Sequence, residues 1–165
     1  MPERAVILLV EDNQDDVSFI LRAFKRAEIS NPIYAVADGE EAMAYLSGEG
    51  DYSNRTDYPL PELILLDLNL PGTDGFQVLR WLRQQPGFAS IRVLVLTSSN
   101  EVYSVNRAYK LGANSFLVKP SDFENFVELG RIISHFWLRA SKAPTVSRPL
   151  PEPTPSPPGS GVSAP

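Results

Sequence analysis

The chain has 165 residues, 43% of them hydrophobic, which is enough for one packed domain and too little for two ordinary ones. Its 15 basic and 20 acidic residues give a formal net charge of -5, and the basic residues are scattered, which argues against DNA binding. With no cysteine, disulfides, zinc thiolate sites and thiol catalysis are excluded. No signal-peptide core and no apolar stretch of about 20 residues is present, so we expect a cytoplasmic protein with no membrane partner.

Short apolar runs alternate with amphipathic segments along the chain. The first run, residues 6–10, is continuously apolar, as expected of a parallel strand that is covered on both faces. In chain order the pattern predicts a strand at 6–10, a helix at 15–28, a strand at 33–36, a helix at 38–46, a strand at 63–66, a helix from Phe76 through Leu82, a strand at 91–96, a helix at 101–111, a strand at 115–118 and a helix at 122–138. Asp38 with Glu41 resembles a capping box, and Gly112 suits a helix C-cap.

This alternation predicts an α/β fold, a doubly wound parallel sheet of five strands with five helices in a single domain. Residues 47–61 are polar and bounded by proline, and we expect a long surface loop there. The folded domain should cover residues 4–141. Residues 142–165, rich in proline and serine, should form a disordered tail.

Chemically active side chains stand at the carboxyl ends of four predicted strands. Glu11 and Asp12 follow the first strand, Asp67 the third, Thr97 the fourth and Lys119 the fifth. In a doubly wound sheet these ends meet at one edge, where ligands bind. A lone aspartate after a strand is usually a cap, and Lys-Pro is usually a turn. The joint placement of these groups is what indicates a site.

Carboxylates packed together are costly unless a cation joins them. Oxygen ligands with no histidine or cysteine favour a hard cation, Mg²⁺, with Mn²⁺ as an alternative. Such an ion recruits phosphate oxygens, and an aspartate can act as the nucleophile that forms an acyl phosphate. A lysine and a hydroxyl beside it provide the charge neutralisation and positioning that phosphoryl transfer requires.

The segments LLVEDN, LILLDLNLPGTDG, VLVLTSSN and NSFLVKP resemble the receiver domain of response regulators, and the resemblance extends over most of residues 5–138. It implies a flavodoxin-like fold and a signalling role without an independent substrate, although such domains catalyse their own phosphorylation and dephosphorylation. It also implies that Asp67 is the phosphoacceptor. The implied metal ligands are Asp12 directly, Glu11 through water, Asp67, and the backbone carbonyl of Asn69.

The same resemblance implies a switch. Thr97 matches the switch hydroxyl and Lys119 the essential lysine, while Phe116 stands at the position of the switch aromatic and lacks the hydroxyl of tyrosine. We expect phosphorylation to draw Thr97 toward the phosphoryl group and Phe116 inward, which alters the surface made by the fourth helix, fifth strand and fifth helix.

The last predicted helix carries two apolar stripes. The first contains Phe123, Phe126, Val127, Ile133 and Trp137. The second, with Leu129, Ile132 and Phe136, lies about 100° away and predicts a homodimer interface. A helix covered by neighbouring loops is the alternative.

The long loop and the pair Phe136-Trp137 resemble stand-alone regulators that pair with bacterial phytochrome kinases. The expected partner is therefore a sensor histidine kinase of that kind. A general single-domain receiver or phosphorelay intermediate remains the alternative. A haloacid-dehalogenase-like phosphatase is disfavoured because Asn69 stands where that family has its second aspartate. A transcription factor is disfavoured because nothing after residue 141 suggests a helix-turn-helix.

Overall fold

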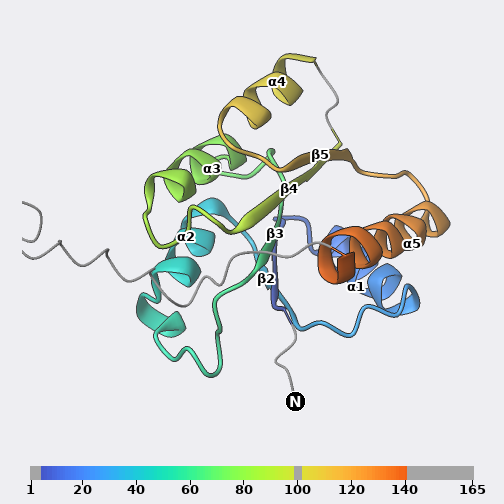
Figure 1. Ribbon diagram of the computed structural model, residues 1–165, viewed down its shortest axis with the longest axis horizontal. Coiled ribbons are helices and arrows are strands. Elements are labelled where there is room, and N and C mark those ends of the chain that lie inside the picture. The colour runs from blue at the N-terminus through green and yellow to red at the C-terminus, as the bar shows by residue number, and fades with distance from the viewer. Residues whose placement is uncertain (1–4, 99–101, 141–165) are drawn as a thin grey trace, which may run out of the picture.

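The computed structural model describes residues 5–98 and 102–140. Five parallel strands form one sheet in the order β2-β1-β3-β4-β5 (Figure 1). The strands are β1 (Ile7–Val10), β2 (Ile33–Val36), β3 (Leu63–Leu66), β4 (Arg92–Thr97) and β5 (Ser115–Val118). The helices are α1 (Gln14–Arg26), α2 (Gly39–Ser47), α3 (Gly75–Gln84), α4 (Val102–Lys110) and α5 (Phe123–Ile132), with a 3-10 turn η1 (Gly50–Tyr52) and a π-helix η2 (Ile133–Ala140).

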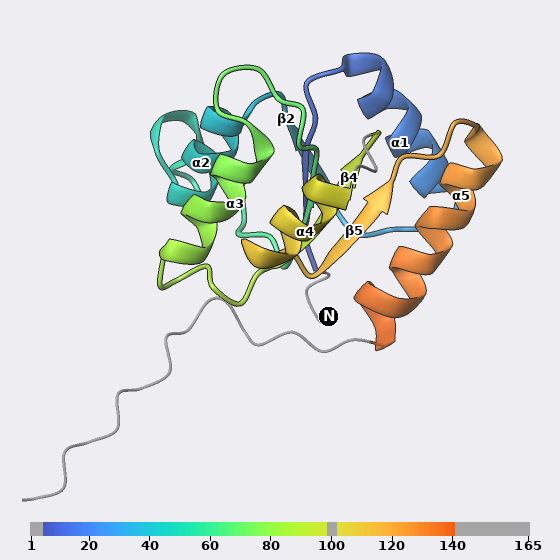
Figure 2. The ribbon, with the colours of Figure 1, turned by 90° about the horizontal axis from the view of Figure 1, so that it is seen from above.

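Helices cover both faces of the sheet. Figure 2 shows α1 and α5 on one side and α2, α3 and α4 on the other. Alternate residues of β1 enter two separate cores, with Ile7 and Leu9 packing on the α1–α5 side and Leu8 and Val10 on the opposite side. The predicted doubly wound sheet is therefore confirmed.

Side-chain caps explain where several helices begin. Asn13 caps α1 by accepting from the backbone of Asp15 and Asp16, and Asp122 caps α5. Asp38 caps α2 as expected, but Glu41 accepts from the backbone N–H of Ala37 and not from that of Asp38. The predicted capping box is therefore wrong in its second half. A complete box joins Asp74 and Gln77 at the start of α3.

The long loop before β3 is held by aromatic packing. The rings of Tyr34, Tyr45, Tyr52 and Tyr58 contact one another, and the Tyr45 hydroxyl donates to the Pro59 carbonyl at 2.7 Å. Arg55 donates to the carbonyls of Tyr45 and Leu46 at the end of α2 and to that of Tyr58 within the loop. The expected surface loop thus follows a defined path against α2.

The last helix changes its winding after Ile132, because η2 continues as a π-helix. Ile133 is buried and Trp137 packs against the α1–α5 core, which confirms the first apolar stripe. Ile132 and Phe136 remain 54% and 57% exposed. Leu129 is half-buried and packs partly against the core, so it is less exposed than Ile132 and Phe136, and its place in a dimer interface stays a prediction.

The predicted tail, residues 142–165, lies outside the described residues, as do residues 4, 101 and 141 at the predicted boundaries. Within the described part of the chain, no helix is long and apolar enough to cross a membrane.

Candidate functional site

Three carboxylates meet at the carboxyl edge of the sheet. Carboxylate oxygens of Glu11, Asp12 and Asp67 lie within 4.8 Å of one another. The register of the strands brings Glu11 and Asp67 together, because β1 and β3 are neighbours and pair Val10 with Leu66, the residues just before these two acids. Glu11 and Asp67 are only 2% and 5% exposed, whereas Asp12 faces solvent. The pocket therefore holds two buried carboxylates and one that opens to water.

Lys119 supplies the positive charge of the pocket. Its Nζ lies 2.6 Å from Glu11 Oε2 and 3.0 Å from Asp67 Oδ2. The pairing of β5 with β4 places Lys119 at this edge, and its backbone N–H donates to the Thr97 carbonyl at 2.8 Å. One ammonium group is thus shared by the two buried carboxylates, and it does not balance their charge.

This imbalance changes the pKa values of the pocket. Burial raises the pKa of Glu11 to about 7, and the nearby Asp67 adds to the rise while Lys119 opposes it. For Lys119, burial alone would lower the pKa, but its hydrogen bonds and charge interactions with Glu11 and Asp67 outweigh burial and raise it. The lysine therefore stays charged, whereas Glu11 takes up a proton easily.

Thr97 is buried at the end of β4. Its Oγ1 accepts a hydrogen bond from Asn69 Nδ2 at 3.4 Å, and the Asn69 backbone N–H donates to Asp67 Oδ1 at 3.1 Å. Asn69 therefore links Thr97 to Asp67 in this state. Its backbone carbonyl as a metal ligand stays a prediction.

Phe116 is half-buried and packs against the core on the α3–α4 side of the sheet. Its backbone N–H donates to the Tyr109 hydroxyl at 3.1 Å. The fold thus connects β5 to α4 through Tyr109, a contact that sequence periodicity gave no reason to expect.

Asp16 is a pocket residue that the strand-end pattern missed. Its Oδ2 lies 3.2 Å from Lys119 Nζ, although the side chain is half exposed. Asp16 belongs to the first turn of α1 and not to a strand end, so the pattern of residues after the strands does not include it. The available signal was Asn13, a good N-cap residue that starts α1 just after Glu11 and Asp12 and so keeps the first turn of the helix near the strand end.

Gly75 explains how α3 approaches the site. A methyl group there would overlap the carbonyl oxygen of Asp67 and the Cα of Leu68. Only glycine lets the helix begin this close to the acidic residue.

Comparison with other proteins identifies the family of this chain. The family model described as response regulator receiver domain matches residues 7–130. The chain belongs to this family. It is 38% identical over 139 residues to response regulator Rcp1 of Synechocystis sp., covering 84% of this chain and 92% of that one. It therefore acts as a receiver in two-component phosphorelay signalling.

Two solved structures support the assignment. The phosphorylated cyanobacterial phytochrome response regulator RcpA superposes with a TM-score of 0.79 at 36% identity, over 86% of this chain and 99% of that one. The Mn²⁺-bound form of Rcp1 gives a TM-score of 0.76 at 37% identity, over the same 86% and 99%.

The donor set of this receiver domain fits the expected Mg²⁺ cofactor. Two buried carboxylates and one exposed carboxylate offer the oxygen ligands that this ion prefers, and the exposed side leaves positions for water and phosphate oxygens. Within residues 5–98 and 102–140, no other group of three or more potential ligands of the Asp, Glu, His or Cys type comes together. The metal-dependent chemistry thus centres on this pocket.

Proposed function

We propose that Asp67 accepts a phosphoryl group from a sensor histidine kinase in a Mg²⁺-dependent reaction. One observation carries the proposal: Asp67 lies in the three-carboxylate cluster, contacts Lys119 and is linked to Thr97 through Asn69. In the proposed state, Glu11, Asp12, Asp67 and the carbonyl of Asn69 hold the metal ion. Lys119 then neutralises charge on the phosphoryl oxygens.

The proposed switch follows from the contacts of Thr97. Phosphorylation adds acceptor oxygens beside Asp67, and the Thr97 hydroxyl moves to donate to one of them, which breaks its contact with Asn69. Phe116 turns into the space that is vacated, and this movement reshapes the surface made by α4, β5 and α5. The domain catalyses its own phosphorylation and dephosphorylation and uses no other substrate.

Beryllofluoride, a mimic of the acyl phosphate, tests both steps. With Mg²⁺ it should shift the amide resonances of Thr97, Phe116 and α4, and Asp67→Asn should abolish these shifts. Equal spectra with and without the mimic would disprove the switch. Asp74→Asn, which keeps the helix cap, serves as the control.

We also propose a bacterial phytochrome as the kinase. The support is the similarity to Rcp1 and to RcpA, which is described as a phytochrome response regulator. A general receiver or phosphorelay intermediate is the competing proposal. Phosphotransfer from a panel of kinases of one genome, with a phytochrome kinase included, separates the two. The cytoplasmic location stays a prediction.

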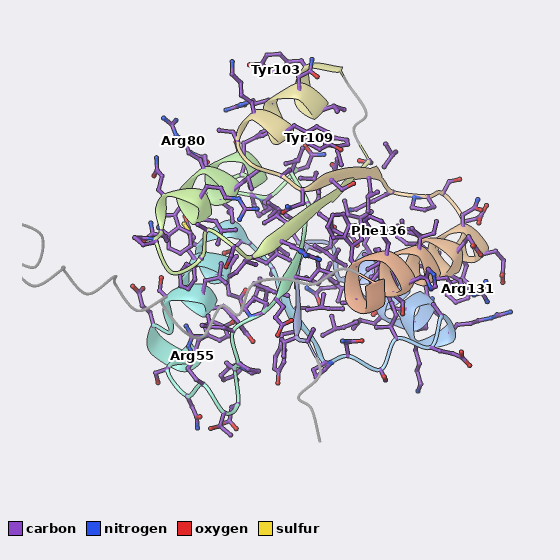
Figure 3. All side chains as sticks on the ribbon, in the orientation of Figure 1. Arg55, Arg80, Tyr103, Tyr109, Arg131 and Phe136 are labelled. Carbon is purple, nitrogen blue, oxygen red and sulfur yellow. The ribbon has the colours of Figure 1, made fainter. Side chains whose placement is uncertain are left out.

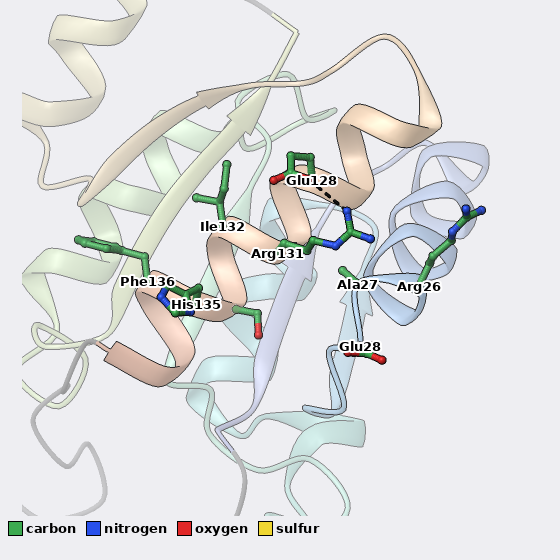
Figure 4. Close-up of a pocket in the computed structure, with 9 residues that line it drawn as sticks. Arg26, Ala27, Glu28, Glu128, Arg131, Ile132, His135 and Phe136 are labelled. Atoms are coloured by element: carbon green, nitrogen blue, oxygen red, sulfur yellow. Dashed lines mark hydrogen bonds and ion pairs between the residues drawn. The ribbon is translucent and has the colours of Figure 1, made fainter.

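A homodimer through the last helix is a third proposal. Ile132 and Phe136, one helical turn apart, are exposed beside a groove of about 730 Å³ between the end of α1 and the last helix (Figure 4). Arg26 and Arg131 line the same groove. Sedimentation equilibrium should detect a dimer, and Ile132→Ser with Phe136→Ser should give a monomer. A monomeric wild type at tens of micromolar, with and without phosphorylation, would disprove this interface.

A further inference from the structure

The charges of this chain are unevenly distributed. Residues 75–121 contain six of the 15 basic residues and one of the 20 acidic residues, so this segment carries a net +5 while the rest of the chain carries -10. The segment runs from the start of α3 to three residues past the end of β5, and one of its cations, Lys119, belongs to the acidic pocket. A protein that is acidic as a whole therefore has one basic region, and composition alone does not account for it.

Part of this basic region forms a groove. A depression of about 330 Å³ lies between α3 and α4 and is lined by Phe76, Gln77, Arg80, Arg107, Lys110 and Leu111. Figure 3 shows Arg80 projecting outward from α3 on the side where α4 lies. The Arg107 guanidinium lies over the Phe76 ring, 4.3 Å from its centre, which is a cation–π contact between two residues that line the groove.

The three cations of this groove are not neutralised. Among the residues that the structure describes, no carboxylate lies within ion-pair distance of Arg80, Arg107 or Lys110. Two exposed cations elsewhere do have carboxylate partners: Arg26 pairs with Glu124 and Arg131 pairs with Glu128. The groove thus presents exposed positive charge above a partly apolar floor.

We propose that the α3–α4 groove binds an acidic segment of a partner protein. Carboxylates of the segment pair with Arg80, Arg107 and Lys110, and its apolar side chains pack on Phe76 and Leu111. A nucleic acid fits less well, since a polyanion that extends beyond the groove meets the part of the chain that carries -10. The site is separate from the acidic pocket, which uses none of these residues.

A short fluorescein-labelled peptide, Glu-Phe-Glu-Asp-Leu-Asp-Glu, tests the proposal with the whole chain. It should bind with an affinity that falls as salt rises, and amide shifts should concentrate in α3 and α4. The variant R80E/R107E/K110E should weaken binding by about tenfold or more, because three exposed ion pairs become repulsive. The variant R22E/K25E, compared with R107E/K110E, makes the same change of charge away from both grooves and should bind like wild type.

Three results would overturn the proposal. Equal loss in R22E/K25E and R107E/K110E would mean that net charge alone attracts the peptide. Shifts scattered over the surface, or no binding at low salt, would mean that the groove is no binding site. Tighter binding of single-stranded DNA than of the peptide, lost in R80E/R107E/K110E, would make this a nucleic-acid surface instead. Circular dichroism confirms that each variant is folded.

Discussion

The two ends of the sheet use buried charge in opposite ways. At the carboxyl end, Glu11 and Asp67 share the single ammonium group of Lys119. At the amino end, the Arg83 guanidinium donates to the carbonyls of Gly112, Ala89 and Ile91 and to Asn114 Oδ1. Among the described residues, Arg83 contacts neutral acceptors and no carboxylate, and it ties α3 to the segments that precede β4 and β5.

The two ends of the sheet differ in whether their charges and hydrogen-bonding groups are matched. The amino end has its donors and acceptors paired, which stabilises one arrangement. The carboxyl end has more negative than positive charge in a buried place, and this excess is what a divalent cation offsets. The amino end of the sheet is thus held by paired hydrogen bonds, and the carboxyl end carries the unbalanced charge that binds metal. Changing each end should reveal effects that differ in their dependence on Mg²⁺.

Removing Lys119 should have the largest effect. Lys119→Met leaves Glu11 and Asp67 buried without a cation, and we expect a loss of about 4 kcal/mol in the free energy of unfolding without metal. Mg²⁺ should restore most of the loss. Urea unfolding with and without Mg²⁺ measures both. Lys25→Met, at an exposed lysine of α1, is the control, and an equal loss there would contradict the role assigned to the pocket.

Removing Arg83 should lower the free energy of unfolding by less than removing Lys119, and Mg²⁺ should not restore the loss. Arg83→Met leaves several carbonyls without their donor, and water replaces only part of the loss, so we expect about 2 kcal/mol. Burial lowers the pKa of Arg83, in agreement with a desolvated guanidinium. The same unfolding experiment applies. If Mg²⁺ restored the stability of Arg83→Met, the two ends of the sheet would not differ in their dependence on metal.

Stability and Mg²⁺ affinity at the carboxyl end should both depend on pH through Glu11. The pKa of Glu11 is raised from 4.5 to about 7, so its contribution to the stability of the metal-free protein is complete below pH 4.5 and is lost as pH rises to 7. A metal ion competes with this proton. Mg²⁺ affinity should therefore rise up to about tenfold per pH unit as pH approaches 7 and level off above it.

Titration calorimetry over this pH range measures the effect. Glu11→Gln has no proton to displace and should bind Mg²⁺ more weakly with a flatter pH profile. An unchanged slope in Glu11→Gln would show that another group takes up the proton.

Replacing Asp16 should have the smallest effect on the free energy of unfolding. Its contact with Lys119 is half exposed, and Asp16→Asn should change the free energy of unfolding by only about 0.5 kcal/mol. The Asn13 cap of α1 is retained in this variant and needs no further control. A loss as large as that of Lys119→Met would move Asp16 into the essential part of the pocket.

Much of this molecule could be predicted from its pattern. Short apolar runs marked all five strands within one residue of their observed bounds. The central strands β1, β3 and β4 are buried on both faces and tolerate little else, and the partly exposed edge strands β2 and β5 are still mostly apolar. Glu11, Asp12, Asp67, Thr97 and Lys119 follow strand ends directly, so topology alone brings them together. The doubly wound parallel sheet and the acidic cluster rest on these local signals, and the flavodoxin-like assignment came from the family resemblance.

What could not be predicted depends on contacts between distant segments. Asp16 reaches Lys119 from α1, Tyr109 reaches Phe116 from α4, and Leu129 packs partly against the core while Ile132 and Phe136 stay exposed. The π-helix after Ile132 also alters which residues share a face, and a constant angle per residue cannot anticipate it.

The sequence by itself determined the order of the elements, the strand ends and the identity of the five groups placed there, since these follow from apolar periodicity and from the geometry of parallel sheets. Tertiary structure decided how charge is shared. One lysine came to serve Glu11, Asp16 and Asp67, while Arg80, Arg107 and Lys110 found no carboxylate among the described residues. Coulomb interactions depend on distance and burial, and both are properties of the folded chain.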